Sequence, residues 1–540
     1  MAFCTPSDLD FVTRFVCIGS EEGSYNVLAA SDFTDKTPSL SSFLCKEKGK
    51  EAIDRLRKIF QNRSYITKEP LLYALAKIIR NTPVSKNHEE DDIRIAAYSL
   101  AQDACESAMD LFTFVHYDKV AAEPKKAGWG RGMRRLVSRW YDSKTPLKLA
   151  SEVTKCKSGR GWTHRDLLRQ CHIKPDRKSK GLSVVVDYVV HRGKKCENFP
   201  ESDDKEVQEV VAFLKDINSL ASSQPTEGAL VRSLIEKHKF TERQIPSFLF
   251  QSPETFEGLL GHMKLEDIFK SIPKMASLGM LHHASAQVGH VMDIVKNLTL
   301  IQQEKIHPIV IFLALRRYEA DRSKKWIKNY HLIKALHAAF NVSLQSLPRI
   351  GKRMLLAVHV DNKVAKQHVS GANFLSPIMP CALMAKFLLE SEDNIQVVFF
   401  HQKVIELNIR RKTTMAGIIE QFINCTKEPA NAIYDISEPL KWATQNKKLF
   451  DNILIISDKK IVSSHLEFHE TVKLYRREVS LPNAKLVYIS LSDFSYLNDK
   501  NDLNTLEISG FNERIPPMVY KFFLGKFDFT EDLNEAAALP

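Results

Sequence analysis

The first 350 residues contain one amphipathic helical pattern after another and little strand-like alternation. Between Leu71 and Ile79, apolar residues recur at three- and four-residue spacing, and Pro70 opens that pattern where its missing N–H is harmless. Short amphipathic helices cannot bury their apolar faces singly, whereas stacked helix pairs can. The sequence therefore predicts an α-solenoid, whose repeats are degenerate because no fixed period recurs. The predicted helices are 51–60, 70–81, 92–107, 131–141, 146–156, 163–171, 182–192, 203–214, 228–238, 285–299, 307–320 and 328–341.

The pattern changes near Gly351, after which apolar strands alternate with helices. Continuous apolar runs are typical of buried parallel strands, and the β-α-β-α order indicates a doubly wound α/β sheet. We therefore expect a mainly α chain, with a helical-repeat domain at 8–350 and an α/β domain at 351–527. The predicted strands are 353–360, 395–400, 452–457 and 485–491, and the predicted helices are 373–390, 415–425, 438–449, 463–479 and 516–524.

Positive charge is concentrated in residues 119–195. The whole chain has a net charge of +12, but this stretch alone carries 21 Lys and Arg against six acids, so the remaining residues sum to −3. A concentrated basic segment attracts polyanions, and each phosphate that it neutralises releases counterions. This pattern favours nucleic-acid binding over a merely solvated surface. Aromatic and His side chains, which can stack on unpaired bases, stand among the charges, although Trp140 and Trp162 are each more typical of core residues; the set is Trp129, Trp140, Tyr141, Trp162, His164 and His172.

The composition indicates a globular protein that stays inside the cell. Hydrophobic residues make up 44% and charged residues 26%, which is ordinary for globular proteins. No apolar run reaches the roughly 18 residues of a membrane helix, and the first residues lack a signal-peptide pattern. The nine cysteines include no Cys-x-x-Cys pair, so we expect reduced thiols that hold no structural metal. We also expect no cofactor. We expect a cytoplasmic location, with Lys and Arg clusters that also permit import into the nucleus.

Short motifs spread along the chain are similar to those of one family. They include RFVCIGS at 14–20, GWGR at 128–131 and, most densely, GWTHRDLLR at 161–169 followed by HIKP at 172–175. These stretches resemble the sixty-kilodalton Ro ribonucleoprotein autoantigen family, which combines a TROVE module with a von Willebrand factor A-like domain. The resemblance is densest in 11–195 and becomes weak beyond about residue 360.

The resemblance implies a ring of HEAT-like helical repeats that the A-like domain closes. In the family, a basic outer surface binds a small noncoding Y RNA, and a central hole takes the single-stranded 3′ ends of misfolded RNAs. It thus implies a monomeric protein of RNA quality control that is not an enzyme, has no membrane association and can contact other proteins through its A-like domain.

The candidate RNA contacts are cations and one His of the basic stretch. The resemblance places Lys155 and His172 where the family uses a Lys and a His, whereas a third family position, an Arg, is Gly159 here with Arg160 beside it. Phosphate contacts position RNA without reading its sequence, so recognition is expected to depend on shape. The full set is Lys125, Lys126, Arg131, Arg134, Arg135, Lys155, Lys157, Arg160, Arg165, Arg169, His172 and Lys174.

The A-like domain departs from the metal-binding pattern that its relatives resemble. The first loop of that pattern, Asp-x-Ser-x-Ser, is replaced by a loop that starts at His359 and contains Asp361 and Lys363; Tyr434 replaces a Thr of the second loop, and Asp458 keeps the third. Mg²⁺ prefers oxygen ligands in octahedral geometry, and the Lys363 ammonium repels a cation. We expect no stable Mg²⁺ at this degenerate site. The alternative is a rearranged site, built on Asp361, Asp435 and Asp458, that takes a softer metal with His359.

Two other functions stay open from the sequence. Paired imidazoles can act as general acid and base on a phosphodiester, so His164, His172 and His191 could belong to a ribonuclease, although no set of nucleophile, base and orienting group is visible. A helical solenoid with an A-like domain could instead be a protein-binding scaffold without a specific RNA cargo. We favour an RNA-binding protein that is not an enzyme.

Overall fold

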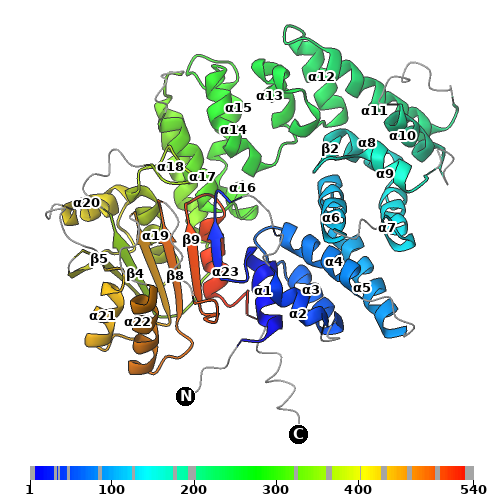
Figure 1. The fold of residues 1–540 in the computed structure, drawn as a ribbon. Helices are drawn as coiled ribbons and strands as arrows, with labels where there is room; N and C mark the ends of the chain where they lie inside the picture. The colour runs from blue at the N-terminus through cyan, green and yellow to red at the C-terminus, as the bar shows by residue number, and fades with distance from the viewer. Residues whose placement is uncertain are drawn as a thin grey trace. The chain divides into compact units, whose positions relative to one another are not determined.

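The fold of the chain is shown as a computed structural model in Figure 1. The structure describes residues 6–29, 33, 37–45, 49–82, 88–123, 128–173, 179–191, 202–320, 326–360, 368–401, 403–426, 435–458, 465–492 and 499–528. Two compact units make up the chain. The helical unit comprises Phe43–Phe60 and Lys68–Gly289, and the sheet unit comprises Met1–Ser42, Gln61–Thr67 and His290–Pro540.

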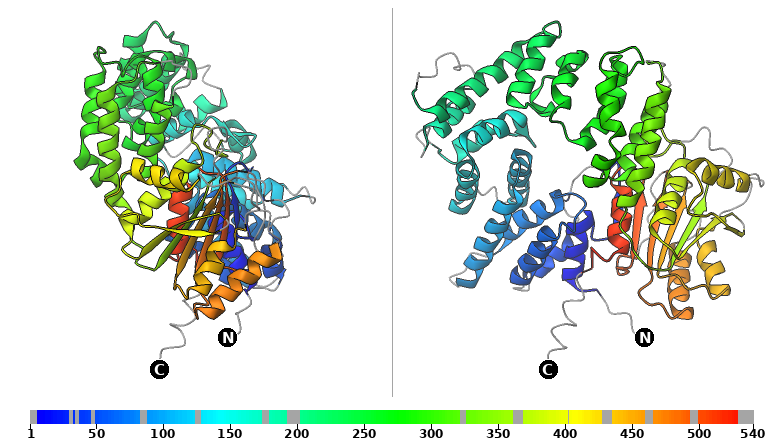
Figure 2. Two further views of the ribbon diagram at one scale, coloured as in Figure 1. Left: turned by 90° about the vertical axis from the view of Figure 1, so that its left-hand side faces the viewer. Right: turned by 180° about the vertical axis from the view of Figure 1, so that it is seen from behind.

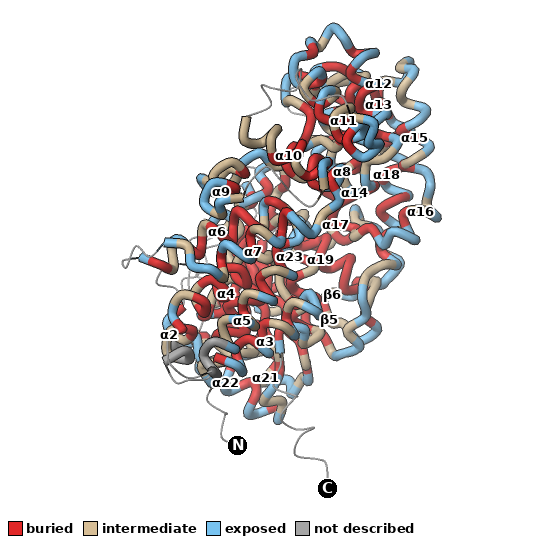
Figure 3. The backbone as a smooth tube through the Cα atoms, turned by 90° about the vertical axis from the view of Figure 1, so that its right-hand side faces the viewer, coloured by how far each residue is buried: buried red, intermediate tan, exposed pale blue. Residues whose placement is uncertain are grey.

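The helical unit is a succession of short helices that pack on their neighbours in the chain. Helix α4 contacts α5 and α6, α8 contacts α10 and α11, and α12 contacts α13. Buried and exposed positions alternate along these helices, as Figure 3 shows. The helices are α3 (Gly49–Gln61), α4 (Glu69–Asn81), α5 (His88–Ala104), α6 (Ala108–Ala121), α7 (Arg131–Asp142), α8 (Pro146–Lys155), α9 (His164–Gln170), α10 (Lys180–Val190), α11 (Lys205–Ser222), α12 (Gly228–His238), α13 (Pro253–Leu260) and α14 (Leu265–Ser277).

Short non-helical elements and turns complete this unit. A hairpin of β2 (Ser158–Gly159) and β3 (Trp162–Thr163) separates α8 from α9, and the 3-10 turns η2 (Glu242–Gln244) and η3 (Ser247–Gln251) follow α12. The sequence prediction missed α6, α13 and α14. Helix α6 buries residues on most of its sides and so lacks a one-sided apolar stripe, and α14 contains Pro273, which normally ends a helix.

The sheet unit is built on a seven-stranded sheet with the order β1-β9-β8-β7-β4-β5-β6. All neighbouring strands are parallel except β5 and β6. Helices α21 and α22 pack on one face, and α19 and α23 lie on the other (Figure 2). The strands are β1 (Ser24–Asn26), β4 (Met354–His359), β5 (Ile395–Phe400), β6 (Val404–Leu407), β7 (Asn452–Ser457), β8 (Lys485–Ser490) and β9 (Thr505–Ser509). The helices that follow β4 are α19 (Ile378–Ser391), α20 (Met415–Cys425), α21 (Glu438–Gln445), α22 (His465–Glu478) and α23 (Ile515–Phe523).

Helices from both ends of the helical region also belong to this unit. They are α1 (Asp8–Ile18), the start of α2 (Pro38–Cys45), most of α15 (Val288–Lys296), α16 (Leu298–Gln303), α17 (Pro308–Glu319), α18 (Tyr330–Ser343) and the 3-10 turn η4 (Leu344–Ser346). The compact units therefore do not follow chain order, and the domain bounds 8–350 and 351–527 stay a prediction. The predicted fold class, a helical N-terminal part followed by a doubly wound α/β domain, is confirmed.

Buried Arg14 connects α1 to the loop before β9. Its guanidinium donates hydrogen bonds to the backbone carbonyls of Lys500, at 3.1 Å, and Asp502. Burial lowers the pKa of Arg14 to about 10, and the Asp502 carboxylate partly opposes that effect. This contact and the parallel pairing of β1 with β9 explain why the N-terminal segment belongs to the sheet unit.

None of the described helices combines the length and apolar character that crossing a bilayer requires.

Candidate nucleic-acid interface

Helix α7 presents a row of arginines on one side. Arg131, Arg134, Arg135 and Arg139 are all exposed, and their spacing of three, four and eight residues places them on one helical face. Among the residues that the structure describes, Lys155, Arg160 and His191 of the basic stretch form ion pairs, and these four arginines do not. The opposite face is buried and carries Met133, Leu136, Val137, Trp140 and Tyr141. We call the four exposed residues the α7 arginine face; it is free to bind anions.

The β2–β3 hairpin turns at Arg160 and Gly161, whose φ angles are 50° and 79°. Two successive positive φ values are typical of the type I′ turn of two-residue hairpins, and Gly161 adopts its value without steric cost. The Arg160 guanidinium donates to Glu69 Oε1 at 2.7 Å and lies 6.0 Å from the centre of the Tyr117 ring. Arg160 is thus engaged within the protein, which weakens its candidacy as a phosphate ligand.

Gly159 stands where the resembled family has an Arg, and the local packing suits a glycine. A Cβ atom at this position would lie 2.9 Å from Met109 Sδ and 3.1 Å from Phe112 Cδ2, both closer than ordinary contacts. A larger residue would therefore displace the flexible Met109 side chain. An Arg at this position would thus require Met109 and the Phe112 ring to shift.

Helix α9 begins with the capping box that the sequence predicts. The Thr163 backbone N–H donates to Asp166 Oδ2 at 3.0 Å, and the Asp166 N–H donates back to Thr163 Oγ1 at 3.2 Å. Arg169 and His172, the second residue after the helix, are exposed, whereas Arg165 is half-buried. Helix α7 contacts α9, so the cations of both helices belong to one region of the helical unit.

An aromatic cluster beneath these cations fixes α7 and α9 together. His164 is buried; its Nδ1 accepts a hydrogen bond from the Tyr141 hydroxyl at 2.6 Å, so its Nε2–H donates to the Cys156 carbonyl at 3.0 Å. The Trp140 ring stacks on His164 with centroids 6.0 Å apart. Burial lowers the pKa of His164 to about 4. This imidazole is therefore neutral at physiological pH and serves the core.

We expect acid to destabilise the helical unit through His164. Because its folded pKa lies below the unfolded value of about 6.5, the unfolded chain binds the proton more tightly, and stability falls as pH drops from about 6.5 towards 4. The loss is about 2 kcal/mol at pH 5. Urea unfolding of the wild type and of His164→Gln at pH 7 and pH 5 measures it. His164→Gln should lose that much less between the two pH values, and equal losses in both proteins would contradict the assignment.

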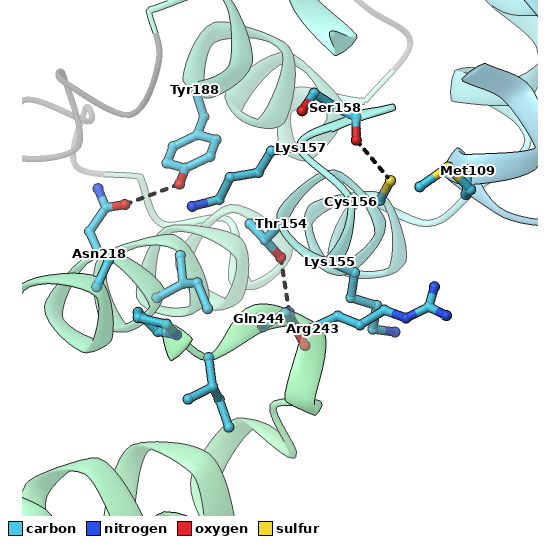
Figure 4. Close-up of a pocket in the computed structure, with 14 residues that line it drawn as sticks. Met109, Thr154, Lys155, Cys156, Lys157, Ser158, Tyr188, Asn218, Arg243 and Gln244 are labelled. Carbon is cyan, nitrogen blue, oxygen red and sulfur yellow. Dashed lines mark hydrogen bonds between the residues drawn. The ribbon is translucent and has the colours of Figure 1, made fainter. Parts of the chain in front are cut away.

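A cavity of about 540 Å³ opens beside α8, lined also by the β2–β3 hairpin, α10, α11 and η2. Lys155, Lys157 and Arg243 supply three cations, and none of the described residues that line it is acidic. In Figure 4, Lys157 points toward Tyr188 and Asn218, whereas Lys155 and Arg243 extend at the other side. The cavity is thus a positively charged recess next to the hairpin.

Hydrogen bonds position the walls of this cavity. The Tyr188 hydroxyl of α10 donates to Asn218 Oδ1 of α11 at 3.0 Å. Gln244 Nε2 donates to Thr154 Oγ1 at 2.9 Å, while Gln244 Oε1 accepts the Thr241 backbone N–H at 3.0 Å. The first bond attaches η2 to the end of α8 and the second fixes the turn itself, so together they bring Arg243 to the cavity that Lys155 lines.

The structure gathers some of the sequence-predicted residues and leaves others apart. Lys155 and Lys157 meet at the cavity, although Lys155 Nζ also lies 3.6 Å from Glu152 Oε1. Lys125, Lys126 and Lys174 lie outside the described residues. The sequence prediction missed Arg243, Tyr188 and Asn218 as parts of the site. Only the Thr241–Gln244 capping pattern signals a fixed turn at Arg243, and nothing in the sequence relates that turn to Lys155.

The His residues proposed for a ribonuclease do not form an acid–base pair. His164 is buried and neutral, so it cannot meet a phosphodiester. His191 Nδ1 lies 3.0 Å from Asp187 Oδ1, one turn earlier on α10, and His172 is exposed after α9. This arrangement gives the enzyme hypothesis no support.

The degenerate metal position holds an imidazole against a carboxylate. His359 Nδ1 at the end of β4 lies 3.3 Å from Asp458 Oδ1 after β7, and both side chains are buried. Asp361, Lys363 and Tyr434 lie outside the described residues. The described groups do not fit Mg²⁺, because an imidazole stands where a carboxylate oxygen is needed and occupies one side of Asp458. Among the described residues, no group of three or more His, Cys, Asp or Glu could hold a metal ion.

Comparison with known proteins identifies both parts of the chain. The TROVE domain model matches residues 8–317, and the Ro60 vWA domain model matches residues 353–523. The chain is 26% identical to the RNA-binding protein RO60 of Caenorhabditis elegans, over 96% of this chain and 88% of that protein. The crystal structure of the Deinococcus radiodurans RO (RSR) protein has the same fold, with a TM-score of 0.83 at 20% identity over 96% of this chain and all of that one. The chain therefore belongs to the TROVE-domain family and carries a Ro60-type von Willebrand factor A domain.

Proposed function

We propose that this chain binds RNA through the cations of α7, the C-terminal end of α8 and α9. The observation that carries the proposal is the α7 arginine face, four exposed guanidiniums that no described carboxylate neutralises. Arginine is well suited to phosphate because its planar fork of N–H donors can hold two oxygens. The name of the Caenorhabditis elegans relative supports the same ligand class.

The finer proposal is that the RNA is a small, folded, Y-type noncoding RNA, and that single-stranded 3′ ends of misfolded RNAs are a second ligand. Phosphate contacts from arginines fix the position of RNA without reading its bases, so shape selects the ligand. The chain would then act in RNA quality control as a monomer, without catalysis and without a cofactor, in the cytoplasm and in part in the nucleus. The buried, neutral His164 supports a binding role over cleavage.

A gel-shift or anisotropy titration with a small hairpin RNA tests this proposal. Lys155→Ala combined with His172→Ala should weaken binding roughly tenfold at moderate salt, because two candidate phosphate contacts are lost. The control combines Lys264→Ala with Lys274→Ala, two exposed lysines outside the basic stretch, and should bind only slightly more weakly than the wild type. Equal affinity of the test variant and the control would contradict this assignment. A wild-type affinity that does not depend on salt would instead favour a protein-binding scaffold.

A further inference from the structure

The cavity between the hairpin, α8, α11 and η2 has the features of a small-molecule site as well as those of a basic surface. We propose that it binds one nucleotide that carries a phosphate monoester, either the terminal residue of an RNA or a free mononucleotide. The proposal rests on the proposed function, because the cavity shares Lys155 and Lys157 with the candidate interface. Its volume of about 540 Å³ lies within the roughly 300–1,000 Å³ range of such sites.

The charge of the cavity favours a monoester over an internal phosphodiester. Lys155, Lys157 and Arg243 contribute three positive charges, and Glu152, 3.6 Å from Lys155, offsets one of them. An internal phosphodiester has one negative charge, whereas a phosphate monoester carries about −1.5 to −2 near pH 7. A net charge near +2 therefore interacts more strongly with a terminal phosphate, and charge-assisted hydrogen bonds add to that difference.

Part of the lining is apolar and fits a base. Ile217, Ala221, Ile245 and Pro246 line the cavity, and both isoleucines are buried. Adjoining them, the Tyr188–Asn218 hydrogen bond holds an aromatic ring and an amide at the wall. A nucleobase has an apolar face and a polar edge, and aromatic rings commonly stack on such faces. Lys155 and Arg243 therefore supply a cationic side for the phosphate, whereas Lys157 lies with Tyr188 and Asn218 at the mixed apolar and polar side for the base (Figure 4).

Arg243 is the residue on which this recognition depends most. The Gln244–Thr154 hydrogen bond and the Thr241–Gln244 capping bonds fix the backbone on either side of it. Its side chain is nevertheless exposed, and no described carboxylate pairs with it. A positioned, unpaired guanidinium at a cavity mouth is the group that a phosphate monoester would bind.

Equilibrium titrations of the full chain with two RNAs of one sequence test the proposal. One short single-stranded RNA carries a 5′-phosphate and the other a 5′-hydroxyl; a second arm compares uridine 5′-monophosphate with uridine by ligand-observed NMR. The wild type should bind the phosphorylated RNA roughly tenfold more tightly. Arg243→Gln should reduce this ratio to near one, and so should Ala221→Trp, which fills the cavity without removing a charge. Ala229→Trp, at an exposed alanine of α12 outside the lining, should keep the wild-type ratio.

The outcomes separate this proposal from the proposed function. If the cavity variants lower the ratio of affinities for the 5′-phosphate and 5′-hydroxyl RNAs, the cavity binds RNA ends. If only the mononucleotide gives a signal, and that signal depends on Arg243, the cavity binds free nucleotides. If both RNAs bind the wild type equally and the mononucleotide gives no signal, the cavity proposal is wrong while RNA binding stands. The cavity proposal is also wrong if Arg243→Gln and Ala221→Trp both keep the tenfold preference for the phosphorylated RNA. If neither RNA binds the wild type, the proposed function itself fails.

Discussion

Replacing Trp140 by alanine is expected to destabilise the helical unit by about 3 to 5 kcal/mol, the range for truncating a large buried aromatic. Trp140 is only 1% exposed, and its Nε1–H donates to the Cys105 carbonyl at 2.8 Å. The Lys144 ammonium lies 3.4 Å from the centre of its ring. The variant would leave a cavity, an unpaired buried carbonyl and a lysine without its aromatic partner. Urea unfolding followed by far-ultraviolet circular dichroism measures the loss.

Two further variants separate the contributions at this position. Trp140→Phe retains an aromatic ring but removes the N–H donor, so it should cost less than the alanine variant. Trp129→Ala serves as the control, because Trp129 is only half-buried and its ring partner is the equally half-buried Trp162, with centroids 5.7 Å apart. A loss below about 1 kcal/mol for Trp140→Ala would show that this ring does not hold α7 and α9 together.

Neutralising the α7 arginine face is expected to reduce RNA affinity by about 100-fold or more near 0.15 M salt. The variant changes Arg131, Arg134, Arg135 and Arg139 to Gln. All four side chains are exposed, and no described carboxylate pairs with them, so the wild type has these charges free for phosphate. Anisotropy titration with the small hairpin RNA measures the change. Because surface substitutions of this kind alter folding little, the thermal unfolding midpoint should stay close to that of the wild type.

A control that also replaces cations by glutamine shows whether the loss of RNA affinity depends on the position of the charges or on the total charge. Lys264→Gln with Lys274→Gln removes two exposed cations from the region around α14, outside the basic stretch. This control should lower affinity only slightly, through the weaker overall field of the protein. If the control loses as much RNA affinity for each charge removed as the α7 variant does, RNA binds without a preferred surface.

The α7 arginine face is a feature that the sequence alone could predict. A helix over 131–141 was expected from its apolar spacing, and helical geometry then places Arg131, Arg134 and Arg135 together. The Thr163–Asp166 capping box could be predicted for the same reason, because helical spacing and capping residues are both local features of the sequence. The interpretation of Trp140 as a core residue is confirmed, whereas Trp162 is half-buried.

Features that depend on distant contacts could not be predicted. Arg243 reaches the cavity because Gln244 bonds to Thr154, 90 residues earlier. The ion pair of Arg160 with Glu69, 91 residues away, is likewise not visible in the sequence, and the assignment of Arg160 to RNA stays a prediction. Strand β1 has three residues and no local apolar pattern, and it forms because β9 offers a parallel edge. In each case the deciding partner is remote in the chain, where periodicity and spacing carry no information.

The salt dependence of RNA binding tests the central claim most directly, because it counts the phosphates that the protein neutralises. The logarithm of the binding constant should fall linearly with the logarithm of salt concentration, with a slope of about 0.7 to 0.9 for each phosphate contact. We predict that the slope of the Arg131→Gln, Arg134→Gln, Arg135→Gln, Arg139→Gln variant is smaller than that of the wild type by about 2 to 4. Identical slopes in the two proteins would contradict the claim that the α7 arginine face binds the RNA backbone.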